Sequence, residues 1–233
     1  MENKKAVILL SGGLDSSTIL YLAKSKGYLC FPLSFDYGQR HKKELVCARK
    51  IAESLGLSLI VVKINLPWLS SSLTDKKKPI PSPEKTEKIG ERIPSTYVSA
   101  RNLIFLSIAI SYAEEIGANS IFIGANARDF SGYPDCRDDF LKSFFKTASL
   151  GTKAGVSKKP ISIERPLIDK TKKEIVLLAK GLGVPFELTW SCYKGGRKPC
   201  GICESCFLRK KGFSNAGIID SFKQQLISPR FGL

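Results

Sequence analysis

A glycine-containing turn between a buried apolar run and a helical segment restricts the fold more than any other feature of this chain. The run Ala6–Leu10 is continuously apolar, as in a strand covered on both faces, and Ser16–Lys26 has apolar residues at helical spacing. Between them, residues 11–17 read Ser-Gly-Gly-Leu-Asp-Ser-Ser. Because the amides of such a turn and the following helix N-terminus point at one spot, the turn predicts a phosphate-binding site. It matches neither the kinase-type P-loop nor the dinucleotide-binding motif.

Strand-like and helix-like segments alternate along the chain. Leu29–Phe35 and Leu57–Val62 read as strands, with an amphipathic helix at Arg40–Leu55 between them. Ala100–Ile116 is apolar nearly all round, which predicts a buried helix, and Ser120–Ile123 reads as a fourth strand. Two more helices are expected, at residues 138–150 and, behind a capping box, at residues 171–182. This alternation predicts an α/β fold with an open parallel sheet and helices on both faces.

Length and composition favour a folded chain with one α/β domain and a small appendage. The 233 residues are 43% hydrophobic, which is enough to bury a substantial core and excludes disorder for most of the chain. No apolar run approaches the roughly 20 residues of a membrane span. Residues 1–5 lead straight into the first strand, so we expect a soluble cytoplasmic protein with no membrane partner. The single histidine disfavours His-ligated catalytic metals and Ser-His-Asp chemistry.

The chain is strongly basic. It has 37 Lys and Arg against 21 Asp and Glu, which gives a formal net charge of +16. This excess predicts anionic partners, and two explanations stay open at this point. One is a nucleic acid, and the other is a set of lysine-rich solvated faces with no specific partner.

Residues 67–94 interrupt the strand and helix pattern with five of the twelve prolines and three consecutive lysines. A segment of this composition buries too little apolar surface to order itself, so we expect residues 66–95 to form a flexible loop, either a mobile lid or dispensable decoration. After residue 184 the composition changes again, since four of the seven cysteines follow. We therefore divide the chain into an α/β domain at residues 1–185 and a C-terminal segment at residues 186–233.

The C-terminal segment has the cysteine spacing of a metal site, with seven residues between the first two cysteines and two residues in each later step: Cys192, Cys200, Cys203 and Cys206. Four thiolates with two Cys-x2-Cys steps predict a closed structural Zn²⁺ site. An iron–sulfur cluster is the main rival, but the fourth cysteine of a ferredoxin run would fall at position 210, which is lysine. Disulfides are disfavoured in a cytosolic protein.

Basic residues cluster near these cysteines. They are Lys194, Arg197, Lys198, Arg209, Lys210 and Lys211, with Glu204 as the nearby acid. Zn²⁺ with four thiolates carries a net charge of −2, so part of this cluster is expected to offset the metal site rather than to bind RNA.

The turn at residues 11–17 and two further strings resemble the motifs of a known family. Ser-Gly-Gly-x-Asp-Ser after the first strand resembles the pyrophosphate loop of the N-type ATP pyrophosphatases. Phe-Asp-Tyr-Gly-Gln-Arg-His at residues 35–41 and Asp-Phe-Ser-Gly-Tyr-Pro-Asp-Cys-Arg at residues 129–137 resemble the 7-cyano-7-deazaguanine synthase family of queuosine biosynthesis. The pair Arg101-Asn102 and the terminal cysteines extend this likeness over nearly the whole chain. The chain departs from the family at Ser99-Ala100, where Pro-Gly is usual, and in the length of its proline-rich loop.

The resemblance implies an adenine nucleotide alpha hydrolase-like, Rossmann-like domain with a C-terminal zinc-binding appendage. It also implies an ATP-dependent ligase that forms carbon–nitrogen bonds, converting 7-carboxy-7-deazaguanine and ammonia to 7-cyano-7-deazaguanine through adenylated intermediates. The cofactors would be ATP, Mg²⁺ and Zn²⁺. No nucleic acid is required by this reading, and a homodimer is left open.

Candidate site residues follow from the strings and the resemblance. The expected ATP-binding residues are Leu10, Ser11, Gly12, Gly13, Leu14, Asp15, Ser16, Ser17 and Thr18, of which Asp15 and Ser16 are the catalytic candidates. Asp15 is expected either to hold Mg²⁺ or to position the loop. The expected substrate residues are Arg101, Asp129, Tyr133, Asp135 and Arg137. They follow a strand end, where open α/β sheets bind ligands, although Gly132 and Pro134 would equally serve a turn that only shapes the loop.

Other assignments stay open. Lys170-Thr171-Lys172, at a helix start, is a candidate anion holder or a solvated charge group. His41 is a capping residue or part of the nucleotide pocket, without the role of a general base. The rival functions are a tRNA-modifying thiolase or lysidine synthetase of the same fold, and a non-catalytic zinc-stapled binder of nucleotides or nucleic acid.

Overall fold

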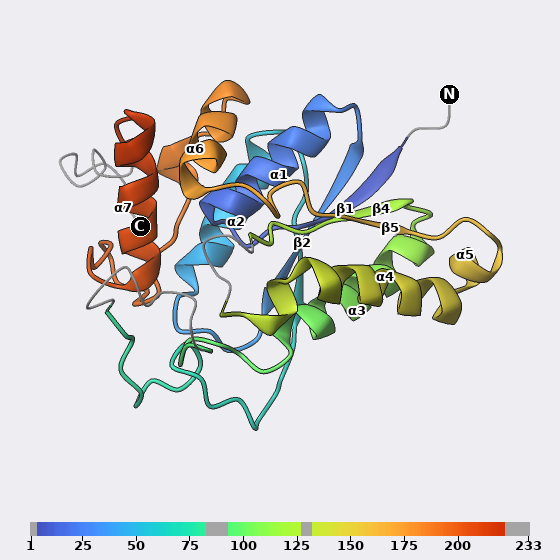
Figure 1. Ribbon diagram of the computed structural model, residues 1–233, viewed down its shortest axis with the longest axis horizontal. Coiled ribbons are helices and arrows are strands. Elements are labelled where there is room, and N and C mark those ends of the chain that lie inside the picture. Colours follow the sequence, from blue (N-terminus) through green and yellow to red (C-terminus); the bar gives the residue numbers. More distant parts are fainter. Residues whose placement is uncertain (1–3, 83–92, 127–131, 222–233) are drawn as a thin grey trace.

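A computed structural model describes residues 4–82, 93–126 and 132–221, and within them the chain forms one five-stranded sheet (Figure 1). The strand order is β3-β2-β1-β4-β5, and every neighbouring pair is parallel. The strands are β1 (Lys5–Leu9), β2 (Leu29–Asp36), β3 (Ile60–Lys63), β4 (Ser120–Phe122) and β5 (Ser162–Glu164). The expected open parallel sheet is confirmed.

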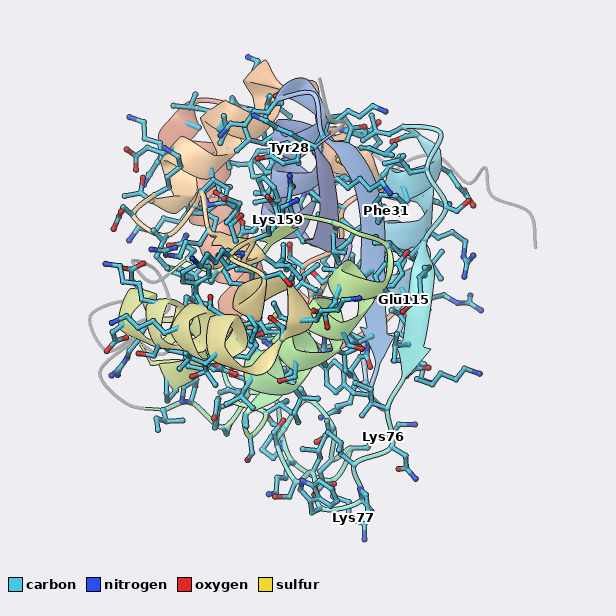
Figure 2. The ribbon with its side chains drawn as sticks, turned by 90° about the vertical axis from the view of Figure 1, so that its right-hand side faces the viewer. Tyr28, Phe31, Lys76, Lys77, Glu115 and Lys159 are labelled. Atoms are coloured by element: carbon cyan, nitrogen blue, oxygen red, sulfur yellow. The ribbon has the colours of Figure 1, made fainter. Side chains whose placement is uncertain are left out.

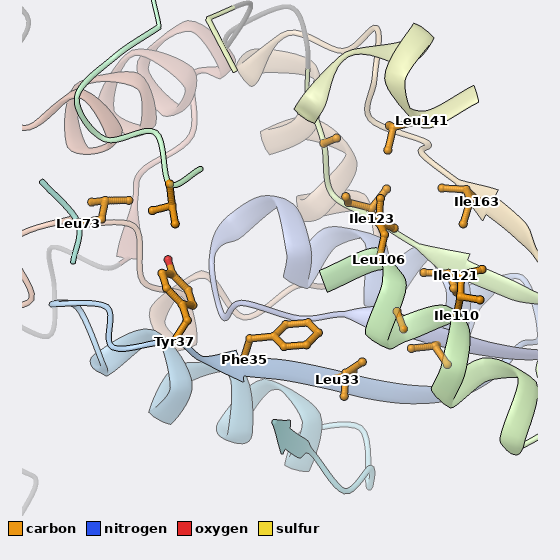
Figure 3. Packing of buried hydrophobic residues seen from close by; sticks show 14 of the residues in the cluster. Leu33, Phe35, Tyr37, Leu73, Leu106, Ile110, Ile121, Ile123, Leu141 and Ile163 are labelled. Atoms are coloured by element: carbon orange, nitrogen blue, oxygen red, sulfur yellow. The ribbon is translucent and has the colours of Figure 1, made fainter. Parts of the chain in front are cut away.

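Helices cover both faces of the sheet (Figure 1). One core cluster joins α1 (Leu14–Ser25), α2 (Lys43–Glu53) and α6 (Lys172–Gly181) to the side chains of Ala6 and Ile8. Val7 faces the opposite side, because successive strand side chains alternate, and belongs to a second cluster. That cluster contains side chains from α3 (Arg101–Glu115) and α4 (Asp138–Gly151). Figure 3 shows part of it, with Leu106 and Ile110 of α3 close to Ile121 of β4.

Three short elements, the longer helix α7 and the strand β5 were not predicted from the sequence. The helical ones are η2 (Pro134–Cys136), α5 (Lys153–Val156), η3 (Phe186–Leu188) and α7 (Glu204–Ala216). A three-residue strand such as β5 carries too few residues for a period to be seen. The helix α7 begins directly after Cys203, so its start coincides with the cysteine cluster rather than with a standard capping side chain.

The helix α3 differs from the expectation of burial on all sides. Leu106, Ala109 and Ala113 are fully buried, but Leu103 is 45% exposed. Only one face of α3 packs against the sheet, so apolar residues on its other faces stay partly exposed.

The proline-rich segment is better anchored than its composition indicated. Its described parts contain no helix or strand, yet Leu73 is only 2% exposed and Ser72 is fully buried. Arg40 donates to the carbonyl oxygens of Ser72 (3.2 Å) and Lys78 (2.7 Å), which fixes residues 72–78 beside the second strand. Lys76 and Lys77 project from this segment away from the sheet (Figure 2). Residues 83–92 of the expected loop lie outside the described residues.

The C-terminal segment packs into both core clusters. Trp190 and Cys192 join the cluster that contains α3, and Phe213 of α7 joins the cluster that contains α6. Arg209, which the sequence grouped with the charges near the cysteines, instead pairs with Asp220 at 2.7 and 2.9 Å and is 6% exposed. Residues on both sides of position 185 therefore contribute to the same two core clusters. The division of the chain at that position stays a prediction.

In the described ranges, helix length and apolarity fall short of what a membrane crossing requires.

Candidate functional site

A cavity of about 270 Å³ lies at the carboxyl ends of β1, β2 and β4. The strand order reverses between β1 and β4, because the chain returns from the edge strand β3 to the other side of β1. Ligands of open α/β sheets bind at such a reversal, outside the carboxyl ends of the strands. The lining includes the turn after β1, the segments after β2 and β4, the first turns of α3 and α6, and the C-terminal segment.

The turn after β1 is held in shape by its own hydroxyl groups. The Ser16 hydroxyl accepts a hydrogen bond from the Ser11 amide and donates to the Gly13 carbonyl, both at 3.1 Å. The Ser11 hydroxyl accepts from the Gly13 amide at 3.3 Å and lies 3.0 Å from the Ser16 hydroxyl. The turn therefore has a fixed backbone conformation before any ligand contacts it.

Six of the nine expected ATP-binding residues line the cavity: Leu10, Ser11, Gly13, Leu14, Asp15 and Ser16. The other three lie behind the turn. Thr18 is fully buried and its hydroxyl donates to the Leu14 carbonyl at 2.7 Å, which is a bond within the helix. The Ser17 hydroxyl is buried without a hydrogen-bond partner among the described residues.

Gly12 has a packing role that the sequence did not show. Its φ is +82°, and a Cβ atom there would lie 2.3 Å from the Glu44 carbonyl oxygen and 2.6 Å from the Ala48 nitrogen. The glycine at position 12 therefore lets the turn approach the backbone of α2. Gly124, after β4, approaches the turn from the other side, with its Cβ position 3.2 Å from the Ser16 nitrogen.

Asp15 forms an ion pair with Lys172, and both residues line the cavity. The ammonium of Lys172 lies 2.7 and 3.0 Å from the two carboxylate oxygens, and the two side chains are 12% and 22% exposed. Lys172 begins α6, whose predicted capping box between Thr171 and Glu174 is confirmed. The capping box fixes the first residue of α6, so Lys172 lies beside the turn at residues 11–17. The sequence had left this helix start open between an anion holder and a solvated charge group, and Lys172 is paired with Asp15 on the cavity.

Arg101, at the start of α3, also lines the cavity. Its guanidinium donates to the Tyr37 hydroxyl at 3.3 Å and lies 6.0 Å from the Tyr37 ring centroid. The preceding residue, Ala100, has φ +53°, a left-handed conformation that glycine adopts more easily. Alanine therefore holds at position 100 a backbone conformation that glycine would adopt at lower cost.

The substrate residues expected after β4 take different positions. Tyr133 lines the cavity, and its hydroxyl lies 2.5 Å from the Thr96 hydroxyl. Asp135 is not a lining residue: its carboxylate accepts from the Asn102 amide at 2.9 Å and so fixes the start of α3. Arg137 directly precedes α4 and also lies off the cavity lining. Asp129 lies outside the described residues.

The cavity also has residues that sequence reasoning did not assign to it, chiefly Tyr37, Glu44, Asn102, Phe105, Trp190 and Tyr193. Two of them, Tyr37 and Asn102, stand inside strings that the family resemblance had singled out. For the aromatic residues of the C-terminal segment no sequence signal was available, because they reach the cavity only through the packing of that segment on the sheet.

Trp190 connects the phosphate turn to the cysteine cluster. Its amide donates to the Gly12 carbonyl and its indole donates to the Cys192 carbonyl, both at 2.8 Å. The ammonium of Lys43 lies 4.1 Å from the centroid of the ring. Trp190 is almost fully buried, and its two hydrogen bonds connect the turn at Gly12 to the backbone at Cys192.

The four C-terminal cysteines come together as expected, with all sulfur atoms within 4.8 Å of one another. A tetrahedral site with Zn–S bonds of about 2.3 Å needs sulfur separations of about 3.8 Å, which this arrangement can supply. Backbone amides donate to the sulfurs of Cys192 and Cys200 at 3.3 Å. These donors suit thiolate ligands, so the cluster fits a metal ion.

Cys136 is the one cysteine among the described residues that lines the cavity. Burial raises the pKa of its thiol to about 12, and the Asp135 carboxylate adds to this effect. The thiol is therefore neutral at physiological pH, which does not favour a nucleophilic sulfur in this cavity.

Comparison with known proteins gives a consistent result. Residues 5–217 match the family described as "Queuosine biosynthesis protein QueC". The chain is 51% identical over 218 residues to the 7-cyano-7-deazaguanine synthase of Trichodesmium erythraeum, covering 93% of this chain and 98% of that one. It is 53% identical over 223 residues to the enzyme of the same name from Clostridium kluyveri, covering 94% and 97%. Among solved structures, NMN synthetase from Francisella tularensis aligns with a TM-score of 0.49 and 16% identity over 96% of this chain and 78% of that one.

Proposed function

Because the chain belongs to the queuosine biosynthesis protein QueC family, we propose that it is an ATP-dependent ligase that makes 7-cyano-7-deazaguanine from 7-carboxy-7-deazaguanine and ammonia. Beyond the family, one observation carries this proposal. The turn expected to bind phosphate and the partly buried side chain of Arg101 line the same cavity, so a triphosphate and a carboxylate can be held together there.

The first step activates the substrate carboxylate. A carboxylate is a poor electrophile, and transfer of AMP to one of its oxygens creates a leaving group. The amides of Leu14, Asp15 and Ser16, in the first turn of α1, and the ammonium of Lys172 are suited to hold the departing pyrophosphate. Mg²⁺, when bound, would neutralise phosphate charge, and Asp15 is the carboxylate placed to hold it.

The second and third steps need no protein nucleophile. Ammonia displaces AMP from the acyl adenylate and gives the amide. A second ATP then adenylates the amide oxygen, and loss of this AMP leaves the nitrile. The neutral Cys136 thiol agrees with a route that uses no covalent enzyme intermediate.

Substrate recognition is proposed for Arg101, with its charge directed at the carboxylate, and for Tyr133 on the same cavity. Asp135 serves this site indirectly by fixing the first turn of α3, in which Arg101 lies. Roles for Asp129 and Arg137 in reading the deazaguanine stay predictions.

The metal proposed for the four cysteines is Zn²⁺ in a structural role. Metal analysis of the purified protein should find one zinc per chain, and Cys203→Ser should lose it. A visible absorption band of thiolate–iron charge transfer would contradict this assignment and indicate an iron–sulfur cluster instead.

The activity test is direct. The protein is incubated with ATP, Mg²⁺, ammonium and 7-carboxy-7-deazaguanine, without RNA, and the nitrile is sought by mass spectrometry. Turnover that appears only when tRNA is added would instead favour a tRNA-modifying enzyme of the same fold.

We also propose a cytoplasmic location and small-molecule partners only. In this proposal most of the lysines behind the net charge of +16 are solvated, and other basic residues bind anions in the cavity.

The role of the turn is tested separately. Asp15→Ala should lower pyrophosphate release by about 100-fold or more while zinc content is unchanged. Glu53→Ala, at the exposed end of α2, is the matched control and should behave like the unmodified protein. Full activity of Asp15→Ala would remove this carboxylate from the mechanism.

A further inference from the structure

The ion pair between Asp15 and Lys172 brings two proposed ligand-binding groups into contact with each other. Asp15 is the carboxylate placed to hold Mg²⁺, and the Lys172 ammonium is suited to hold pyrophosphate. The ammonium lies 2.7 and 3.0 Å from the two carboxylate oxygens of Asp15, so it contacts both of them. While this pair is intact, the carboxylate and the ammonium each have a protein partner in the place of a ligand.

The pair is partly shielded from water. The side chain of Lys172 is 12% exposed and that of Asp15 is 22% exposed, and solvent screens such a pair less than one on the open surface. Removing one partner of a shielded pair is costly, because the other charge is left uncompensated. A ligand that draws the ammonium away from Asp15 therefore binds well only when another cation takes its place on the carboxylate.

The stem of Lys172 is held in place by the C-terminal helix α7. A Cβ atom at Gly212 would overlap the Cγ atom of Lys172 and lie 3.1 Å from its Cβ, so the stem lies directly on the backbone of α7. Lys172 and Asp15 both line the cavity. A lysine ammonium is a compact charge with three donors on a flexible chain, so it can exchange one oxygen acceptor for another while its helix stays fixed.

The Asp15 carboxylate also fits a divalent cation, because both of its oxygens already contact a cation, the ammonium of Lys172. Proteins usually bind Mg²⁺ through one or two carboxylates together with the phosphates of a substrate. A triphosphate in this cavity would supply those phosphate oxygens for the metal and would also offer oxygens to the ammonium. Joint binding of the metal and the triphosphate can thus satisfy both charges of the pair at once.

We propose that Lys172 is an exchangeable counter-ion: it neutralises Asp15 before ATP binds and moves to the phosphates when Mg²⁺ replaces it on the carboxylate. This inference rests on the proposed function, which makes ATP the ligand of the cavity. The exchange couples the two ligands, so that each strengthens the binding of the other by the same factor. Without the metal, a lysine that moves to the triphosphate leaves a bare carboxylate beside it.

The test measures binding and not turnover. Equilibrium dialysis of the full chain against labelled ATP, without 7-carboxy-7-deazaguanine or ammonium, is run once with Mg²⁺ and once with EDTA. The unmodified protein should bind ATP about 50-fold more tightly with Mg²⁺. Asp15→Asn should bind ATP about tenfold more weakly with Mg²⁺ but about tenfold more tightly in EDTA, because its lysine is released. A role of Asp15 only in shaping the turn would weaken binding in both media.

A second background separates release of the lysine from simple removal of a negative charge. In Lys172→Met, the added Asp15→Asn change should raise the affinity for ATP in EDTA at least about fivefold less than it does when Lys172 is present, because no lysine is left to release. Lys173→Met, at the exposed next residue, is the matched control and should leave both dissociation constants unchanged. Circular dichroism of each variant checks that it is folded.

Three results would overturn the proposal. They are weaker ATP binding by Asp15→Asn in both media, an equal gain in EDTA with and without Lys172, and ATP binding by the unmodified protein that does not depend on Mg²⁺. The proposed function fails separately, if the unmodified protein binds ATP in neither medium.

Discussion

Substitution of Gly12 by alanine tests whether the phosphate turn depends on its contact with α2. The added Cβ would meet backbone atoms at 2.3 and 2.6 Å, which no rotamer change can relieve, and the residue has φ +82°. The left-handed conformation costs alanine about 1–2 kcal/mol, and overpacking a rigid site costs about 1–3 kcal/mol more. We therefore expect Gly12→Ala to lose about 2–5 kcal/mol of unfolding free energy.

Gly27 provides the matched control for this prediction. Its φ is +80°, nearly the same as that of Gly12, but a Cβ there would meet nothing within 4 Å. Gly27→Ala should therefore lose only the conformational part, about 1–2 kcal/mol. Urea unfolding of both variants and of the unmodified protein, followed by circular dichroism, measures the difference. Equal losses in the two variants would refute the argument that close approach to α2 makes glycine necessary at position 12.

The remaining predictions concern buried polar groups. Arg209→Met should lose about 3–5 kcal/mol of unfolding free energy, since it leaves Asp220 buried without its ion pair, and adding Asp220→Asn should recover part of the loss in urea unfolding. Trp190→Phe removes the indole hydrogen bond to the carbonyl oxygen of Cys192, one of the four clustered cysteines. Competition with a chelator should therefore show zinc affinity weakened by about tenfold. Burial raises the pKa of the Cys30 and Cys47 thiols from 9.0 to about 11, so the folded state holds these protons more tightly. The free energy of unfolding should therefore fall as pH rises from about 9 to 11, and Cys30→Ala should make that fall shallower.

The phosphate turn and the cysteine cluster were both visible in the sequence, because each is a short string whose residue types and spacing carry its chemistry. The four cysteines meet within 4.8 Å, as their spacing predicted. The capping box at Thr171 and Glu174 belongs to the same class, since it depends on residues three positions apart. Local strings of this kind can be read without knowledge of the fold.

The proline-rich segment shows where composition misleads. Prolines and lysines indicated a segment that could not order itself, yet Leu73 lies in the core and lines the cavity. The buried side chains of Leu73 and Ile80 and the hydrogen bonds donated by Arg40 fix the adjoining backbone. Average composition does not record such contacts, because they depend on what the segment meets in space.

What the sequence alone determined is four of the five strands, the five helices α1, α2, α3, α4 and α6, and the meeting of four cysteines, since periodicity and spacing are properties of neighbouring residues. What only the tertiary structure decided is which side chains share the cavity. Trp190 reaches Gly12 across almost the whole chain, and Asp135 holds the start of α3 instead of facing a ligand. Glu44, which pairs with the ring of His41, is only three residues away in the sequence, but the burial of His41 beside the cavity could be known only from the structure. Burial and long-range contacts arise from packing elements together, so no local pattern encodes them.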